Sequence, residues 1–394
     1  MKSSVKFLGL ALLLAFATTF AQAQHKYVHK SNGKETLVNY EGKITLSDND
    51  QDIVAISDYG FFRFKVNRRE VLIKAEAGGK LTRTFYVRGR KQAYEPEGRA
   101  WLARELPKLV RRGGFGAESR VARFFKKGGT SAVLAEIQNI ESDYGQQKYF
   151  NYLLQNHPVK DSELKGVVNA IGNTISSDYY KGKILRKNQQ RFLKNNETAD
   201  AYITAVASIK SSYEKSKALR KAMEGNLPTN LMTKVLDASM NIDSDYEKSK
   251  VLRGIAKRKQ LNDQELDKIL AATNKISSDY EKSKVLRTIL GHNKLNDQQT
   301  VKTIEMIRRI GSDYESSKIL RGILRTSSAS ETQLTAILKA TSYLSSDYEK
   351  GKVLVQVGKL IPNNNQKLKD QFAKVARSIS SDHTYGKVMR SLDR

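Results

Sequence analysis

The chain has 394 residues, of which 39% are hydrophobic, and a formal net charge of +28. This length is enough for two or three domains, and the hydrophobic fraction is typical of folded chains. The sequence contains no cysteine, which excludes disulfides, thiolate metal sites and cysteine nucleophiles. Its five histidines form no HExxH motif, and we expect no metal site, no cofactor and no catalytic residue.

Residues 1–23 have the pattern of a secretory signal peptide. Lys2 and Lys6 come before an apolar run from Phe7 to Phe20, and Ala21-Gln22-Ala23 is a small-residue cleavage site. The apolar run of about 14 residues is shorter than the roughly 20 that a membrane-spanning helix needs, which argues against a membrane anchor. We therefore expect a mature chain that begins at Gln24, is exported to the periplasm or secreted, and has no transmembrane segment.

The positive charge extends over the whole expected mature chain. Without the two lysines of the signal the net charge is +26, of which residues 114–394 carry +18. A field of this sign attracts anionic partners. Outside the cytoplasm these are anionic glycans, lipid head groups, acidic proteins or nucleic acid debris, whereas export makes intracellular nucleic acid a poor candidate.

Residues 24–96 have the pattern of an antiparallel β domain. Apolar residues recur with a period near two between Thr36 and Tyr94, and turn signals such as Glu41-Gly42, Ala77-Gly78-Gly79 and Arg88-Gly89-Arg90 separate the runs. Such a pattern predicts five or six strands. A sheet of this size needs another element to cover one face.

Residues 97–113 are predicted to form that covering helix and a hinge. Its apolar residues, Trp101 among them, are spaced for one helical face, and Gly113-Gly114 follows as a stop. The run Gly113-Gly114-Phe115-Gly116 lacks the lysine and serine of a phosphate-binding loop and follows a helix, so we interpret it as a helix end.

A twelve-residue motif recurs through the rest of the chain. Its clearest copy is Ile276-Ser-Ser-Asp-Tyr-Glu-Lys-Ser-Lys-Val-Leu-Arg287, and the steps between copies are 33–35 residues. A fixed period of this size is typical of a stacked repeat array. We therefore predict an α+β protein in which residues 114–394 form an α-solenoid of about eight two-helix repeats. The copies centre on Tyr144, Tyr179, Tyr213, Tyr246, Tyr280, Tyr314, Tyr348 and His383.

The pattern of each repeat predicts two helices, each with a capping residue at its start. In the repeat around Tyr280, a first helix is predicted from Asp263 to Lys275 with a capping box at Asn262 to Glu265. A second helix is predicted to begin at Ser278, with Glu281 reaching back to the Ser278 amide, and to run to Leu290 with Gly291 as its stop. The residues assigned to this repeated architecture are Ser244, Asp245, Tyr246, Ser278, Asp279, Tyr280, Ser312, Asp313 and Tyr314.

Several positions of the motif recur with little variation. The residue three after each tyrosine is mostly serine or glycine, which predicts the close approach of another helix. The next residue is always lysine, and arginine follows three residues later in six repeats. The tyrosine, lysine and arginine lie within about 60° on the second helix and predict one stripe along the array. The candidate ligand-binding residues are Lys183, Lys217, Lys250, Lys284, Lys318, Lys352, Arg220, Arg253, Arg287 and Arg321.

This stripe has two interpretations. In the structural one, the tyrosines pack between repeats as interlocking core, while the lysines and arginines pair with acidic residues or carbonyl groups of a neighbouring repeat. In the functional one, the stripe is a cationic groove for an extended anionic ligand. Exposed tyrosine rings along the lysines would favour a glycan or a nucleic acid, and buried rings would favour a plain scaffold.

The Ser-Asp-Tyr-x-Lys-x-Lys-x-Leu pattern resembles repeats in exported regions of bacterial proteins related to antirepressor-type membrane metallopeptidase sensors. In those proteins a small β region precedes the repeats, and here residues 42–94, Ala100-Trp101-Leu102-Ala103 and residues 116–121 resemble that arrangement. The peptidase motif HExxH is missing, so the resemblance implies an interaction module without proteolysis or transmembrane signalling.

Together these patterns predict a non-enzymatic exported binding or scaffold protein that uses a basic solenoid surface to bind a protein or an anionic envelope component. Two alternatives remain at the level of sequence. One is a hydrolase of envelope polymers with paired carboxylates, although helix capping explains the repeated acids. The other is an exported nucleic-acid or glycan binder.

Overall fold

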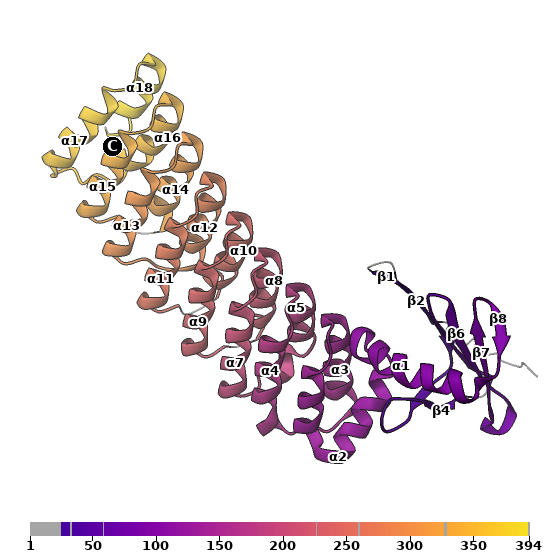
Figure 1. Cartoon of the computed structure of the whole chain (residues 1–394). Helices are drawn as coiled ribbons and strands as arrows, with labels where there is room; N and C mark the ends of the chain where they lie inside the picture. The colour runs from indigo at the N-terminus through magenta and orange to yellow at the C-terminus, as the bar shows by residue number, and fades with distance from the viewer. Residues whose placement is uncertain are drawn as a thin grey trace, which may run out of the picture. The chain divides into compact units, whose positions relative to one another are not determined.

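The computed structural model describes residues 25–31, 34–57, 59–225, 227–258, 261–326 and 329–392. It has two compact units, one up to Arg123 and one from Phe124 onward. The fold is α+β, as predicted: a small antiparallel sheet is followed by helices in a repeated arrangement (Figure 1). The predicted signal peptide, residues 1–23, lies outside the described residues. Within the described ranges, no helix combines the length and the apolar character needed to cross a bilayer.

The first unit is built on a six-stranded antiparallel sheet. Its order, β1-β2-β5-β6-β7-β8, places consecutive strands next to each other except where the separate hairpin β3–β4 intervenes. Glycine or left-handed residues close the turns, for example Arg88 and Gly89, which both have positive φ. The strands are β1 (His25–Ser31), β2 (Lys34–Glu41), β3 (Ile44–Leu46), β4 (Ile53–Ile56), β5 (Phe61–Val66), β6 (Arg69–Ala75), β7 (Leu81–Val87) and β8 (Arg90–Gln92).

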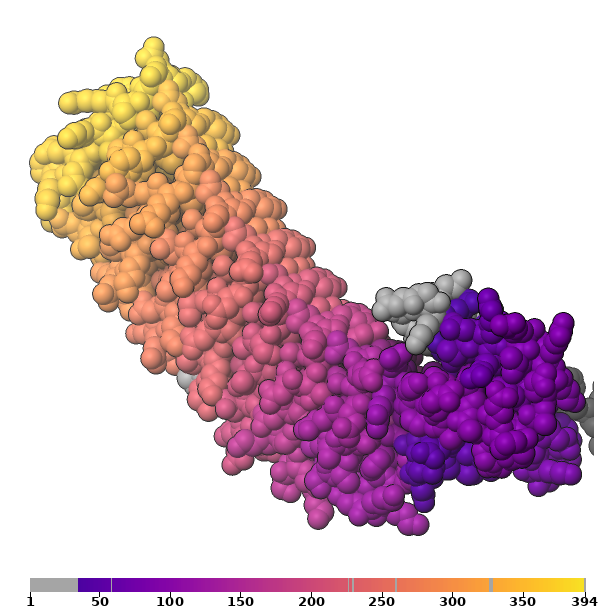
Figure 2. All heavy atoms as spheres, viewed as in Figure 1, coloured from indigo at the N-terminus to yellow at the C-terminus, as the bar shows by residue number. Residues whose placement is uncertain are grey.

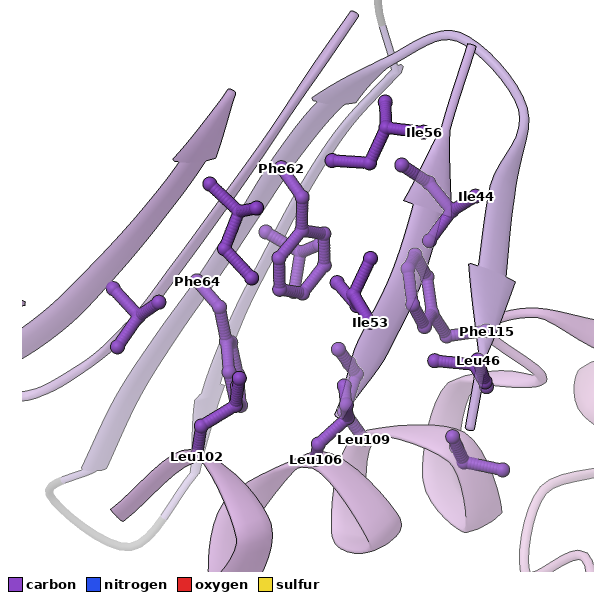
Figure 3. Close-up of a cluster of buried hydrophobic side chains, with 14 of the residues drawn as sticks. Ile44, Leu46, Ile53, Ile56, Phe62, Phe64, Leu102, Leu106, Leu109 and Phe115 are labelled. Carbon is purple, nitrogen blue, oxygen red and sulfur yellow. The ribbon is translucent and has the colours of Figure 1, made fainter. Parts of the chain in front are cut away.

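Helix α1 (Arg99–Gly113) covers one face of this sheet, as the sequence predicted. Trp101 lies in the core with a relative exposure of 3%, and Leu106 is fully buried against the aromatic residues of β5. Figure 3 shows Phe62 and Phe64 of β5 facing side chains of α1 and of the β3–β4 hairpin. The predicted helix stop is confirmed: Gly114 is left-handed (φ 60°), and its N–H donates to the carbonyl oxygen of Val110.

The second unit is a solenoid of helical hairpins. The helices that carry the repeated tyrosine position, here called B helices, form one layer, and the helices before them, here called A helices, form the other (Figure 1). The B helices are α3 (Asp143–Asn156), α5 (Asp178–Lys187), α8 (Ser212–Ala222), α10 (Asp245–Ala256), α12 (Asp279–His292), α14 (Asp313–Thr326), α16 (Asp347–Gly358) and α18 (Asp382–Met389).

The A helices complete the hairpins. The first lies in α2, a helical segment that spans the boundary between the two units and is interrupted at Gly128 and Gly129. A short helix, α6 (Gln189–Phe192), is an addition that the repeat pattern did not predict. The A helices are α2 (Ala117–Gln138), α4 (Leu164–Thr174), α7 (Asn196–Ala207), α9 (Thr229–Met240), α11 (Asp263–Asn274), α13 (Asp297–Ile307), α15 (Glu331–Thr341) and α17 (Gln366–Ala376).

Neighbouring hairpins bury a continuous apolar core between the two layers. In α12 the fully buried apolar residues are Val285, Leu286 and Ile289, and the same positions are buried in the hairpins on either side. Figure 2 shows that the hairpins of this unit follow one another in chain order along its length. Because each hairpin packs mainly on its neighbours, the array has the nearest-neighbour construction of a repeat protein.

Two details of the predicted caps are wrong. Gly291 lies inside the last turn of α12, and the helix ends at Asn293, whose side chain donates to the carbonyl oxygens of Ala256 and Ile289. Ser278 caps α12 as predicted, but Glu281 does not reach back to the Ser278 amide. The capping box of the A helix α11, at Asn262 and Glu265, is complete.

Candidate functional site

The outward face of the first seven B helices, α3 to α16, carries the repeated tyrosine. In α12 the buried residues Lys282, Val285 and Ile289 lie about 140–200° around the helix from Tyr280 at 100° per residue. Tyr280 therefore points away from the core, and its exposed fraction is 56%. The prediction that the tyrosines form interlocking core is wrong, because the interlocking positions are those on the flanks of the helix.

All seven tyrosines at this position are exposed, by 44–66%. Each has the lysine four residues later folded over its ring, with 3.8–5.6 Å between the lysine Nζ and the ring centroid. These are cation–π distances. We call this row the Tyr–Lys ladder; its pairs are Tyr144–Lys148, Tyr179–Lys183, Tyr213–Lys217, Tyr246–Lys250, Tyr280–Lys284, Tyr314–Lys318 and Tyr348–Lys352.

Three ladder lysines contact a glutamate of their own helix. Lys352 Nζ lies 3.1 Å from a carboxylate oxygen of Glu349 on the same helix, and Lys250 and Lys284 make the same contact with their own glutamates at 3.3 and 3.4 Å. The Tyr348 side chain and then Glu349 raise the pKa of Lys352, and Tyr246 with Glu247 raises the pKa of Lys250. The amino groups of Lys250 and Lys352 are therefore protonated at neutral pH.

The arginines of the predicted stripe do not join the ladder. Arg287 Nη2 lies 3.7 Å from Glu315 in the next hairpin, and Arg186 pairs in the same way with Glu214. Arg253 and Arg321 donate to backbone carbonyl oxygens four residues earlier, and Arg220 occupies the same half-buried position of α8. The structural interpretation thus fits the arginines, whereas the ladder consists of tyrosine and lysine.

The aspartate of the motif links each hairpin to the next. Asp245 Oδ2 accepts hydrogen bonds from the Ser277 and Ser278 amides of the following hairpin at 2.9 and 2.8 Å. Asp143, Asp178, Asp279, Asp313 and Asp347 accept equivalent bonds. In α8 the motif has Ser212 instead, and its hydroxyl oxygen accepts two such bonds at 3.2 Å. This inter-hairpin bond replaces the predicted reach of Glu281 to the Ser278 amide.

The small residues of the motif face the next B helix, as predicted. Ser249, Ser283 and Ser317 are buried and donate to Glu281, Glu315 and Glu349 of the following hairpin. A Cβ atom added at Gly182 would lie 2.9 Å from a carboxylate oxygen of Glu214. The repeated carboxylates therefore serve helix starts and contacts between hairpins, which is a structural use of the acids.

A second lysine column was not singled out in the sequence. Lys181, Lys215 and Lys350 are buried and donate to Ser208, Asn241 and Ser378 in the loop of the next hairpin. Burial lowers the pKa of Lys215. The signal was present, because lysine falls within the apolar arc of the helix two residues after five of the seven tyrosines. A buried lysine is expensive unless it is paired, so this column holds hairpins together and is not a binding surface.

The A-helix layer carries a different row of charges. Lys268 of α11 lies 3.3 Å from Asp237 of α9, and Lys302 of α13 lies 3.1 Å from Asp267 of α11. Lys234 of α9 pairs in the same way with Asp200 of α7. These lysines have acidic partners in the preceding hairpin and no tyrosine ring among their described contacts. Across the described ranges, no three histidine, aspartate or glutamate side chains gather in a way that would hold a metal ion.

Comparisons with known proteins add little to this geometry. No protein-family model and no curated protein matches the sequence. One solved structure, from the computational design of self-assembling cyclic protein homooligomers, is similar over 70% of this chain and 92% of that chain. Its sequence identity is 10% and its TM-score is 0.13. A TM-score this low carries no argument about fold or function, so the site is interpreted from its own chemistry.

Proposed function

We propose that this chain is a non-enzymatic binding protein whose Tyr–Lys ladder binds an elongated anionic ligand. The single observation that supports this best is that seven successive hairpins each present an exposed tyrosine ring with a lysine amino group over it. Large apolar groups left exposed in a regular row are typical of interaction surfaces. The core of the hairpin does not need these tyrosines, since they point away from it.

The mechanism is the addition of many weak contacts. One exposed ion pair contributes about 0–1 kcal/mol, and one exposed cation–π contact about 0.5–1 kcal/mol. A ligand long enough to contact several rungs gains effective concentration at each further rung, so its overall affinity exceeds that of any single contact. Because the contacts are charged and exposed, affinity should fall steeply with salt.

The place of action is part of the same proposal. The signal-like pattern of residues 1–23 supports export, and the resemblance of the repeats to exported interaction modules supports a role in the envelope. An acidic protein or an anionic envelope polymer would then be the ligand.

The test compares two variants with the same loss of charge. The ladder variant replaces Lys250, Lys284 and Lys318 by glutamine. The control variant replaces Lys234, Lys268 and Lys302, which lie on the A helices of the same three hairpins. Biolayer interferometry would measure the binding of poly-L-glutamate, heparin and the oligonucleotide dT20 at low and high salt.

We expect at least one probe to bind the wild-type protein at low salt. The ladder variant should lose at least about tenfold in affinity, while the control variant should stay within about twofold. If none of the probes binds, or if both variants lose affinity equally, the proposed function is wrong.

A further inference from the structure

Ordinary helix packing gives the Tyr–Lys ladder an expected rung spacing that is close to the pitch of one extended polypeptide conformation. B helices packed side by side are about 8–10 Å apart, and each contributes one rung. A polyproline II helix has three residues per turn and a rise of 3.1 Å per residue, which gives about 9 Å per turn. One turn of such a ligand therefore spans one hairpin. A β-strand repeats its side-chain direction every two residues, about 6.7 Å, and would run out of step with the rungs.

The chemistry of a rung also suits this ligand. The exposed tyrosine ring is a flat apolar surface of the kind that proline-rich segments in polyproline II conformation bind. The lysine amino group lies 4.1 Å from the ring centroid at Tyr246 and 4.3 Å at Tyr280. A residue that rests on the ring thus brings its neighbour close to a cation. Each rung can take one apolar residue and one carboxylate.

The charge of the repeated motif indicates how closely the carboxylates of a ligand should be spaced. In α12 the motif carries the two carboxylates of Asp279 and Glu281 and the three cations of Lys282, Lys284 and Arg287. The motif of α10 has the same composition, so each of these two motifs carries one excess positive charge. A nucleic acid strand, with one phosphate per about 3.4 Å of helix rise, is much more densely charged.

We propose, on the basis of the proposed function, that the ligand class of the ladder is an acidic, proline-rich polypeptide segment in polyproline II conformation, with one carboxylate in every three residues. Successive carboxylates would contact Lys250, Lys284 and Lys318, and the residues between them would rest on Tyr246, Tyr280 and Tyr314. A preformed polyproline II ligand loses little conformational entropy on binding, which favours it over a flexible acidic chain.

The test uses four peptides and fluorescence anisotropy with the full protein. The first peptide is (Glu-Pro-Pro)7. The second has the same seven glutamates and fourteen prolines with the glutamates grouped at one end, the third is (Glu-Gly-Gly)7, and the fourth is (Lys-Pro-Pro)7. Heparin and dT20 serve as competitors. The protein variants are the ladder variant and the control variant defined above.

We expect (Glu-Pro-Pro)7 to bind at least about tenfold more tightly than each of the other peptides. Its affinity should fall at least about tenfold in the ladder variant and stay within about twofold in the control variant. Equal affinity for the two peptides of identical composition would overturn the inference, because spacing would then not be recognised. If heparin or dT20 binds through the ladder and no acidic peptide does, the inference fails while the proposed function stands. If no anionic probe binds, both fail.

Discussion

At the scale of single residues, buried glutamates connect the ladder to the packing of the hairpins. Glu349 accepts a hydrogen bond from Ser317 of the preceding hairpin, and it also binds the ladder lysine Lys352. Burial by itself would raise the pKa of Glu349, but the bonds from Ser317 and Lys352 outweigh it, and the pKa lies below its ordinary value of 4.5. One carboxylate thus holds two hairpins together and orients a rung.

This pKa shift predicts a pH dependence of stability. Because the pKa of Glu349 is lower in the folded state than in the unfolded chain, the unfolded state binds more protons as the pH drops below about 4.5. The stabilisation is complete above that pH and is lost as the pH falls through the folded-state pKa. Urea unfolding between pH 7 and pH 3 should show a smaller loss of stability in the Glu349→Gln variant than in the wild-type protein. Equal losses would contradict this assignment.

Substitutions of Asp245 test the hydrogen bonds that link successive hairpins. Its carboxylate accepts the amides of Ser277 and Ser278, and Asp245→Ala would remove both bonds. We expect a loss of about 1–2 kcal/mol in the free energy of unfolding. In α8, Ser212 occupies this position and accepts the equivalent bonds, so a serine variant serves as a control. Asp245→Ser should therefore lower the free energy of unfolding less than Asp245→Ala does. Urea denaturation would decide, and a serine variant as unstable as the alanine variant would refute the link.

At the scale of the element, each B helix divides its surface among three roles. In the B helices from α3 to α16, one face enters the core between the two layers, the flanks contact neighbouring B helices, and the outward face carries the rung. In α12 Ser283 is on a flank and fully buried, while Tyr280 is on the outward face. The largest side chain of the motif is therefore the one that the fold needs least.

A pair of substitutions measures this division. Ser283→Val adds volume to the contact with the next helix and removes the bond to Glu315, and it should cost about 1–3 kcal/mol of stability. Tyr280→Ala removes an exposed ring and should change stability by no more than about 0.5 kcal/mol. Thermal unfolding followed by circular dichroism would compare the two. If the tyrosine variant were the less stable one, the ring would have to be part of the packing.

The hairpins could be predicted from the sequence because their signals are local. The repeat has a period of 33–35 residues, and serine or asparagine caps mark the start of most helices of the array. The predicted caps Ser278 and Asn262 are confirmed. The same holds for the sheet and for α1, which follow from alternation and from one apolar face. The break at Gly128 and Gly129 and the short helix α6 were missed because they depart from the repeat.

The site was only partly predictable. The lysines were identified from their recurrence, and their place beside the tyrosines follows from the spacing of four residues. The partners of Arg287 and Asp245 were not predictable, because they lie in the next hairpin and depend on how the hairpins stack. The exposure of Tyr280 follows from the position of Val285 and Ile289 on the opposite side of the helix, but the recurrence of a residue in every repeat is also typical of packing.

At the scale of the whole molecule, the solenoid repeats one Tyr–Lys pair per hairpin and so places these pairs in a long row. The same contacts between hairpins recur from α3 to α18, so the rungs of the Tyr–Lys ladder face solvent in sequence along the array. Stability depends on the flanks and the core, whereas the proposed binding uses the outward face, so the two should be separable by mutation. The sheet unit has its own core and is not needed for this part of the account.

Ligand binding by the Tyr–Lys ladder can be tested by removing the tyrosine rings and leaving the array intact. A variant with Tyr246, Tyr280 and Tyr314 replaced by alanine would be titrated with poly-L-glutamate, heparin and dT20 beside a Tyr343→Ala control. Tyr343 is equally exposed, by 52%, but follows an A helix and lies outside the ladder. We predict an unchanged melting temperature and at least about tenfold weaker binding for the triple variant only. Unchanged binding by the triple variant, with the array still folded, would contradict a ladder that binds ligand.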